Sequence, residues 1–118
     1  TSVRDDGKVF FDLDNIDLPK DFVIKERWLA FIPAGGYGGN HKHARIECFI
    51  GIGEDMTFIW QDESGKIQEE EMHPNGEYFL FVVHPYLPHA VINKGSKEAI
   101  MLEYANGPLV DVEYLDLI

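Results

Sequence analysis

Alternation of apolar and polar residues at every second position recurs along this chain and constrains its fold more than any other feature. Short apolar runs are bounded by glycine, proline, asparagine and aspartate, and no stretch keeps apolar residues at helical spacing for three turns. Turn residues recur about every eight to twelve positions, which favours a sandwich or closed barrel over a parallel α/β fold. The sequence therefore predicts an all-β protein.

The predicted strands are short. They span residues 8–12, 23–32, 41–50, 56–62, 67–72, 78–83, 90–93, 99–104 and 110–114. Residues 33–39 form a glycine-rich bend, and 73–76 form a further turn. Residues 14–21 indicate one helical turn, which Pro19 limits.

Length and charge restrict the domain count and the partners. With 118 residues, 45% of them hydrophobic and 26% charged, residues 1–118 are expected to form a single globular domain. The formal net charge of −11 opposes binding to nucleic acid and to anionic membranes. The single cysteine, Cys48, cannot form an internal disulfide, and neither a membrane-spanning run nor a signal peptide is recognised. We therefore expect a cytoplasmic protein.

The segment 41–47 carries three kinds of metal-ligating chemistry. On a continuous strand, the odd-numbered His41, His43, Arg45 and Glu47 would all face one way. Two imidazoles two residues apart can bind one ion, and a carboxylate adds an oxygen ligand suited to Mn, Fe, Ni or Zn. A further ligand must come from elsewhere in the chain. His89 is the candidate, because Pro85 and Pro88 stiffen the approach to it.

These residues resemble the cupin family. Gly35, His41, His43 and Glu47 match the first cupin motif, G-x5-H-x-H-x3-4-E-x6-G, over residues 35–54, although its closing glycine is replaced by Glu54. Over residues 76–93, His89 and Asn93 match the second motif, G-x5-P-x-G-x2-H-x3-N. His84 and Tyr86 stand at its proline and glycine positions.

The resemblance implies a double-stranded β-helix, the jelly-roll barrel of cupins, with a divalent transition metal bound by His41, His43, Glu47 and His89. It also implies a homodimer. The run from Gly38 to His43 is most similar to small cupins of nucleotide-sugar and polysaccharide biosynthesis, which often have arginine where this chain has Gly38.

Three further residues are candidate catalytic groups. Arg45 is placed equally well to bind a substrate carboxylate or phosphate, or to pair with Glu47 or another acid. Tyr37, at the expected mouth of the barrel, can stack on a sugar or donate a proton, or merely pack at the rim. His84 can transfer protons near the pocket, although turn histidines are usually only polar surface residues. Cys48 is expected to point away from the metal and to fill core space.

The favoured function is isomerisation or epimerisation of a small, oxygen-rich substrate such as a sugar or nucleotide-sugar, with the metal polarising a carbonyl. One alternative is an Fe-dependent dioxygenase at the same site. A second is a sugar-binding or other small-molecule-binding module without turnover, and a third is a metal-free barrel in which His41 or His43 acts as a general base. The convergence of Glu47 and His89 favours the metal-dependent readings.

Overall fold

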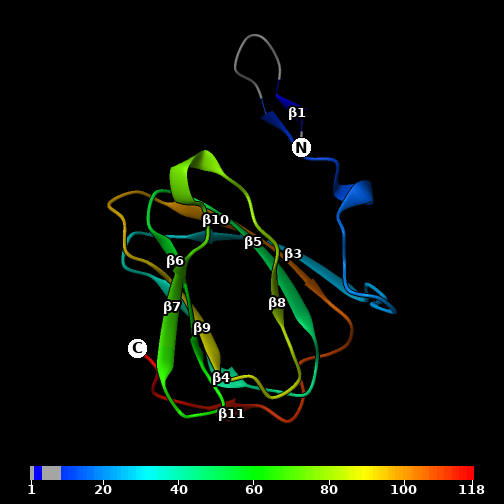
Figure 1. The fold of residues 1–118 in the computed structure, drawn as a ribbon, viewed down its shortest axis with the longest axis vertical. Coiled ribbons are helices and arrows are strands. Elements are labelled where there is room, and N and C mark those ends of the chain that lie inside the picture. The colour runs from blue at the N-terminus through cyan, green and yellow to red at the C-terminus, as the bar shows by residue number, and fades with distance from the viewer. Residues whose placement is uncertain (1, 4–8) are drawn as a thin grey trace.

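The computed structural model describes residues 2–3 and 9–118 and is built on two facing antiparallel sheets (Figure 1). The four-stranded sheet has the order β3-β10-β5-β8, formed by Glu26–Ile32, Ala99–Ala105, Glu47–Ile52 and Phe81–Val83. The five-stranded sheet has the order β11-β4-β9-β6-β7, formed by Glu113–Tyr114, Tyr37–Lys42, His89–Asn93, Met56–Gln61 and Ile67–Glu71. Apart from the β6–β7 pair, each step from β3 to β10 crosses between the sheets, which is the jelly-roll arrangement. The predicted all-β jelly-roll is confirmed.

Four smaller elements complete the described residues. β1 (Ser2–Val3), which was not predicted, pairs with β2 (Val9–Phe10). Single turns of 3₁₀ helix lie at η1 (Leu13–Asn15) and η2 (Pro74–Gly76). Among residues 2–3 and 9–118, no helix is long enough and apolar enough to cross a membrane.

Side chains from the inner faces of both sheets form the core. Phe49 and Met101 come from the four-stranded sheet, whereas Phe58 and Val91 come from the five-stranded sheet, and all four are buried. Alternation along each strand places these side chains between the sheets, because successive residues point to opposite faces. Trp28 and Phe31, although large and apolar, are 57% and 58% exposed on the edge strand β3.

The predicted continuous strand over 41–50 is wrong. β4 ends at Lys42 in the five-stranded sheet, β5 begins at Glu47 in the four-stranded sheet, and residues 43–46 connect them. The chain must change sheets here, so His41 and Glu47 do not share the face of one strand. Their side chains still converge because they belong to two sheets that face each other.

Other differences concern where elements begin. The glycine-rich bend is shorter than predicted, because β4 already begins at Tyr37. Predicted strands 23–32, 78–83 and 110–114 begin later, at Glu26, Phe81 and Glu113. The strand predicted for 8–12 is reduced to β2, and its first residue lies outside the described residues. In place of a turn over 14–21, η1 forms, with the Asp12 carboxylate accepting a hydrogen bond from the Asp14 backbone N–H.

Candidate metal centre

The structure brings together all four side chains that the sequence predicted as metal ligands. His41 lies on β4, His89 on β9 and Glu47 on β5, while His43 lies on the connection between β4 and β5. One ligand atom from each side chain lies within 4.8 Å of the others. The group therefore sits between the two sheets, which hold it from both sides.

A β-bulge in strand β4 places His41 opposite His89. The pairing of β4 with β9 shifts between Gly39 and His41, and both Gly39 and Asn40 have positive φ angles of 77° and 64°. A Cβ atom on Gly39 would lie 3.2 Å from the backbone oxygen of His89, so a side chain there would press on the ligand strand. Asn40 is fixed by the C-terminal segment. Its backbone oxygen accepts from the Leu115 N–H at 2.8 Å, and its Oδ1 accepts from the Leu117 N–H at 2.6 Å.

Backbone carbonyls orient two of the imidazoles. His43 Nδ1 lies 3.1 Å from the Arg45 carbonyl oxygen, and His89 Nδ1 lies 2.8 Å from that of Leu87. Since a carbonyl can only accept, each Nδ1 carries the proton and donates it. In a neutral ring Nε2 is then left with a free lone pair, the usual arrangement in histidines that bind metals.

The Nε2 atoms of His43 and His89 face a carboxylate oxygen of Glu47. The distances between these atoms indicate whether a cation can bind among them. Glu47 Oε1 lies 3.0 Å from His43 Nε2 and 3.2 Å from His89 Nε2. His89 Nε2 is buried and has no hydrogen-bond partner. Three buried acceptors converging in this way need a shared positive charge. A divalent metal fits this donor set of imidazoles and one carboxylate, which leaves coordination positions open.

His41 completes the set from the more open side. Its ring centroid lies 4.8 Å from that of His43 and 4.9 Å from that of His89. Burial, followed by the neighbouring His89 and His43, lowers the pKa of His41 to about 4. The ring is therefore neutral near pH 7, which is the protonation state that metal binding requires.

Arg45 holds the other oxygen of Glu47. Its Nε and Nη2 atoms lie 2.8 and 2.6 Å from Glu47 Oε2, which leaves Oε1 directed at the imidazoles. Arg45 Nη1 also donates to Glu26 Oε1 at 3.0 Å and to the Gly107 carbonyl at 3.3 Å, and Nη2 lies 3.4 Å from Glu103 Oε1. Of the two roles open to Arg45 from the sequence, its contacts match the pairing with acids.

Glu47 and Glu103 both contact Arg45, but their pKa values are shifted in opposite directions. Burial raises the pKa of Glu47, but a proton shared by hydrogen bonding with the imidazoles of His43 and His89 outweighs burial and holds that pKa below its ordinary value. Burial and the nearby Glu47 carboxylate raise the pKa of Glu103 to about 8. The sequence reasoning missed Glu103 and Glu26. A signal existed for Glu103, which shares a strand face with Ala99 and Met101 in an otherwise apolar run.

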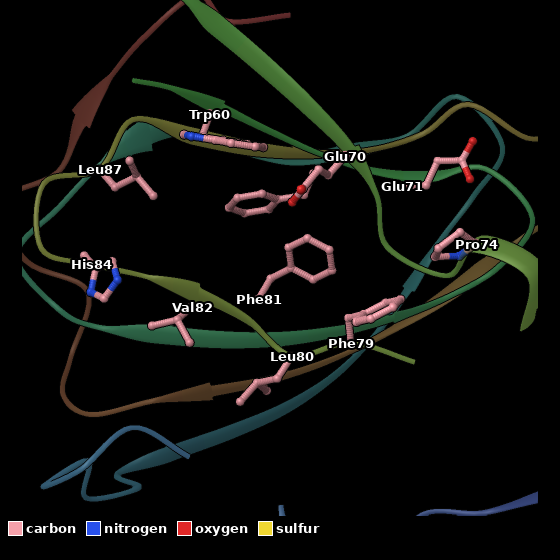
Figure 2. A pocket seen from close by; sticks show the side chains of 11 residues that line it. Trp60, Glu70, Glu71, Pro74, Phe79, Leu80, Phe81, Val82, His84 and Leu87 are labelled. Carbon is pink, nitrogen blue, oxygen red and sulfur yellow. The ribbon is translucent and has the colours of Figure 1, made fainter. Parts of the chain in front are cut away.

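A cavity of about 340 Å³ opens beside three of the four candidate ligands, His41, Glu47 and His89. Its polar lining includes His41, Glu47, His89, Arg45, Glu103 and Tyr37, and its apolar lining includes Ile32, Phe49 and Met101. Two of the candidate catalytic residues, Tyr37 and Arg45, therefore face the same space as the ligands. The third, His84, is exposed and lines a separate, larger cavity on another side of the sandwich (Figure 2). Their catalytic roles stay predictions.

The turn before β9 supports the centre through its backbone. The Tyr86 N–H donates to the His43 carbonyl at 2.7 Å, which ties this turn to the ligand-bearing connection. Tyr86 has a φ angle of 61°, the left-handed conformation that glycine adopts readily, at the position where the second cupin motif has glycine. The departure from the motif therefore keeps the backbone shape.

Comparison with solved structures shows which fold this is. Over 77% of the chain, the structure matches the capsular polysaccharide assembling protein CapF from Staphylococcus aureus, with a TM-score of 0.67 and 16% identity. CapF with the inhibitor 3-isopropenyl-tropolone matches over 76% of the chain, with a TM-score of 0.65 and 17% identity. The chain spans only 28% of either CapF chain. It matches no protein-family model and no curated protein sequence.

A third match is Peruvianin-I, a cysteine peptidase from Thevetia peruviana latex. It covers 78% of this chain and 56% of that protein, with a TM-score of 0.58 and 16% identity. Identities this low show the fold alone.

Cys48 of the present chain is buried, and burial raises the pKa of its thiol to about 11, so it lacks the exposure and acidity of a nucleophile.

These comparisons show the fold of the chain and not its family. The chain has the cupin fold, a jelly-roll of two antiparallel sheets, with a buried group of three histidines and one glutamate that can hold a metal ion.

Replacement of Arg45 by methionine tests its pairing role. We expect Arg45→Met to lower the free energy of unfolding by about 3–5 kcal/mol, because buried Glu47 and its neighbouring acids lose their cation. Lys42→Met is the matched control. Lys42 pairs with Glu113 at the surface, so the expected loss is below about 1 kcal/mol. Urea unfolding of both metal-free variants measures the difference, and equal, small losses would contradict the pairing role.

Proposed function

We propose that this protein is a metal-dependent cupin that acts on a small, oxygen-rich substrate such as a sugar or the sugar part of a nucleotide-sugar, by isomerisation or epimerisation. The observation that carries the proposal is the buried set of acceptors, including the unpartnered His89 Nε2, beside a cavity. The cavity volume, about 340 Å³, lies at the small end of the range for ligand pockets, which favours a single sugar ring. The structural similarity to a capsular polysaccharide assembling protein supports this substrate class.

We propose the following roles for the residues of this chain. His41, His43, Glu47 and His89 would hold a divalent ion, which would supply a Lewis acid for a substrate carbonyl. Arg45 is a positioning residue that keeps Glu47 Oε1 directed toward the imidazoles. Tyr37, 61% exposed at the edge of the cavity, is placed to pass a proton to or from the substrate. The apolar lining limits the water that reaches the reacting carbon.

Metal content tests the first part of the proposal. Protein purified without chelator or tag is expected to carry about one equivalent of Fe, Mn, Ni or Zn, measured by plasma mass spectrometry. His89→Ala and His43→Ala remove ligands and should lose the ion, whereas His73→Ala, in a turn outside the ligand group, should keep it. A wild-type protein that stays metal-free after incubation with all four ions would overturn the metal centre.

Solvent exchange tests the reaction. The metal-loaded protein is incubated in D₂O with aldoses, ketoses and nucleotide-sugars and followed by NMR. Isomerisation or epimerisation through an enediolate places deuterium on the carbon next to the carbonyl, so we expect incorporation with a member of this panel. It should disappear in His89→Ala and persist in His73→Ala. Oxygen consumption without exchange would instead indicate a dioxygenase, and saturable sugar binding without product a binding module.

We further propose that the protein is a homodimer that pairs through strand β3. β3 is an edge strand of the four-stranded sheet, with no second neighbour among the described strands. Trp28, Leu29 and Phe31 on it are 57%, 55% and 58% exposed, which is an unusual concentration of apolar surface on a free edge. A second copy would cover this surface.

Light scattering after size exclusion tests the dimer. We expect a mass near twice the 13.5 kDa of the chain, reduced to that of one chain in Phe31→Lys, because a charge would be buried at the contact. Ile67→Lys is the matched control, since Ile67 is 41% exposed on β7, an edge strand of the five-stranded sheet. A monomeric wild type, or equal dissociation of both variants, would contradict pairing through β3.

A further inference from the structure

A second cavity lies between two edge strands, one from each sheet of the sandwich. β8 is the last strand of one sheet and β7 the last strand of the other, and these two strands do not pair with each other. The space between them is an open cleft of about 700 Å³, large enough for a drug-sized molecule. None of the four candidate metal ligands lines this cleft, which distinguishes it from the cavity described above.

Aromatic side chains form the walls of the cleft. The ring centroid of Phe58 lies 5.2 Å from that of Phe81 and 5.8 Å from that of Trp60. Phe79, 45% exposed, and Leu87 extend the apolar lining at either end (Figure 2). A ligand that buries an apolar group against these rings would remove both surfaces from water.

The exposed side chain of Glu70 lines the open edge of this cleft. Glu70 pairs directly with Phe58 across strands β7 and β6, so both side chains lie on the inner face of the sheet. Figure 2 shows the Glu70 carboxylate beside the aromatic rings, whereas the Glu71 carboxylate points away from them. Glu69, on the opposite face, forms an ion pair with Lys94. Glu70 has neither an ion pair nor a hydrogen bond among the described residues.

The charge around the cleft selects the sign of a ligand. Its lining contains Glu70 and Glu71 but no lysine or arginine, and the whole chain carries a formal net charge of −11. An anionic ligand would be repelled. A cation gains from the Glu70 carboxylate and from the faces of the aromatic rings.

We propose that the cleft between β7 and β8 is a second binding site, which takes a small molecule that joins an aromatic ring to an ammonium group. The ring lies among Phe58, Trp60 and Phe81, and the ammonium group pairs with Glu70. This site goes beyond the proposed sugar chemistry and does not depend on it.

Trp60 provides a built-in reporter for the experiment. The chain has two tryptophans, and Trp28 lies on the distant edge strand β3, so a Trp28→Phe background leaves only the emission of Trp60. This protein is titrated with 2-phenylethylammonium, with 2-phenylethanol and with 3-phenylpropionate, three probes that share the ring and differ in charge. We expect a saturable change for the ammonium, with affinity about tenfold above that for the carboxylate.

Two matched variants assign the charge preference to the proposed residue. Glu70→Gln should reduce the affinity for the ammonium to that for the alcohol, whereas Glu69→Gln, on the outer face of the same strand, should leave it unchanged. Phe81→Ala should weaken all three probes, and circular dichroism checks that each variant is folded.

Two results would overturn the proposal. One is the absence of a saturable change with any probe. The other is a preference for the ammonium that survives Glu70→Gln. If Glu70→Gln instead associates through its sheet edge while no probe binds, Glu70 serves to prevent edge pairing and the cleft is not a ligand site.

Discussion

The carboxylate of Glu47 is the point on which the rest of the site depends. One oxygen accepts a hydrogen bond from Arg45 Nε and forms an ion pair with Nη2, and the other oxygen faces the Nε2 atoms of His43 and His89. Because Arg45 also contacts Glu26 on β3 and Glu103 on β10, the position of one ligand oxygen is fixed by three strands of one sheet. The opposite sheet contributes His41 and His89. The candidate metal centre therefore takes ligands from both sheets, and its geometry depends on how the two sheets pack.

Much of the site was predictable because ligand chemistry is local. The spacing of His41, His43 and Glu47, together with His89 after a proline-rich turn, identified all four members of the group that the structure brings together. The all-β class was likewise predictable, because period-two alternation and turn residues are properties of short segments. At two of the three departures from the motifs, the backbone has a feature that suits glycine. Tyr86 has a left-handed φ angle, and Gly53, one position before Glu54, has no room for a Cβ atom beside Ala99.

What the sequence did not reveal depends on the pairing of distant segments. The change of sheet between Lys42 and Glu47 leaves no mark in the alternation, so 41–47 read as one strand. The bulge at Asn40 depends on its partner strand β9 and on the C-terminal segment, neither of which is near it in sequence. Arg45 could be assigned to a substrate or to an acid with equal reason until Glu26 and Glu103 were placed beside it.

The hydrogen bonds of Asn40 have a practical consequence. The Leu115 and Leu117 N–H groups hold the bulge that positions His41, so residues 115–117 support the candidate metal centre. A change in the backbone of this segment would therefore shift His41 without altering any of the four candidate ligands. Ion binding at the centre would then respond to a segment far from it in sequence, through one asparagine.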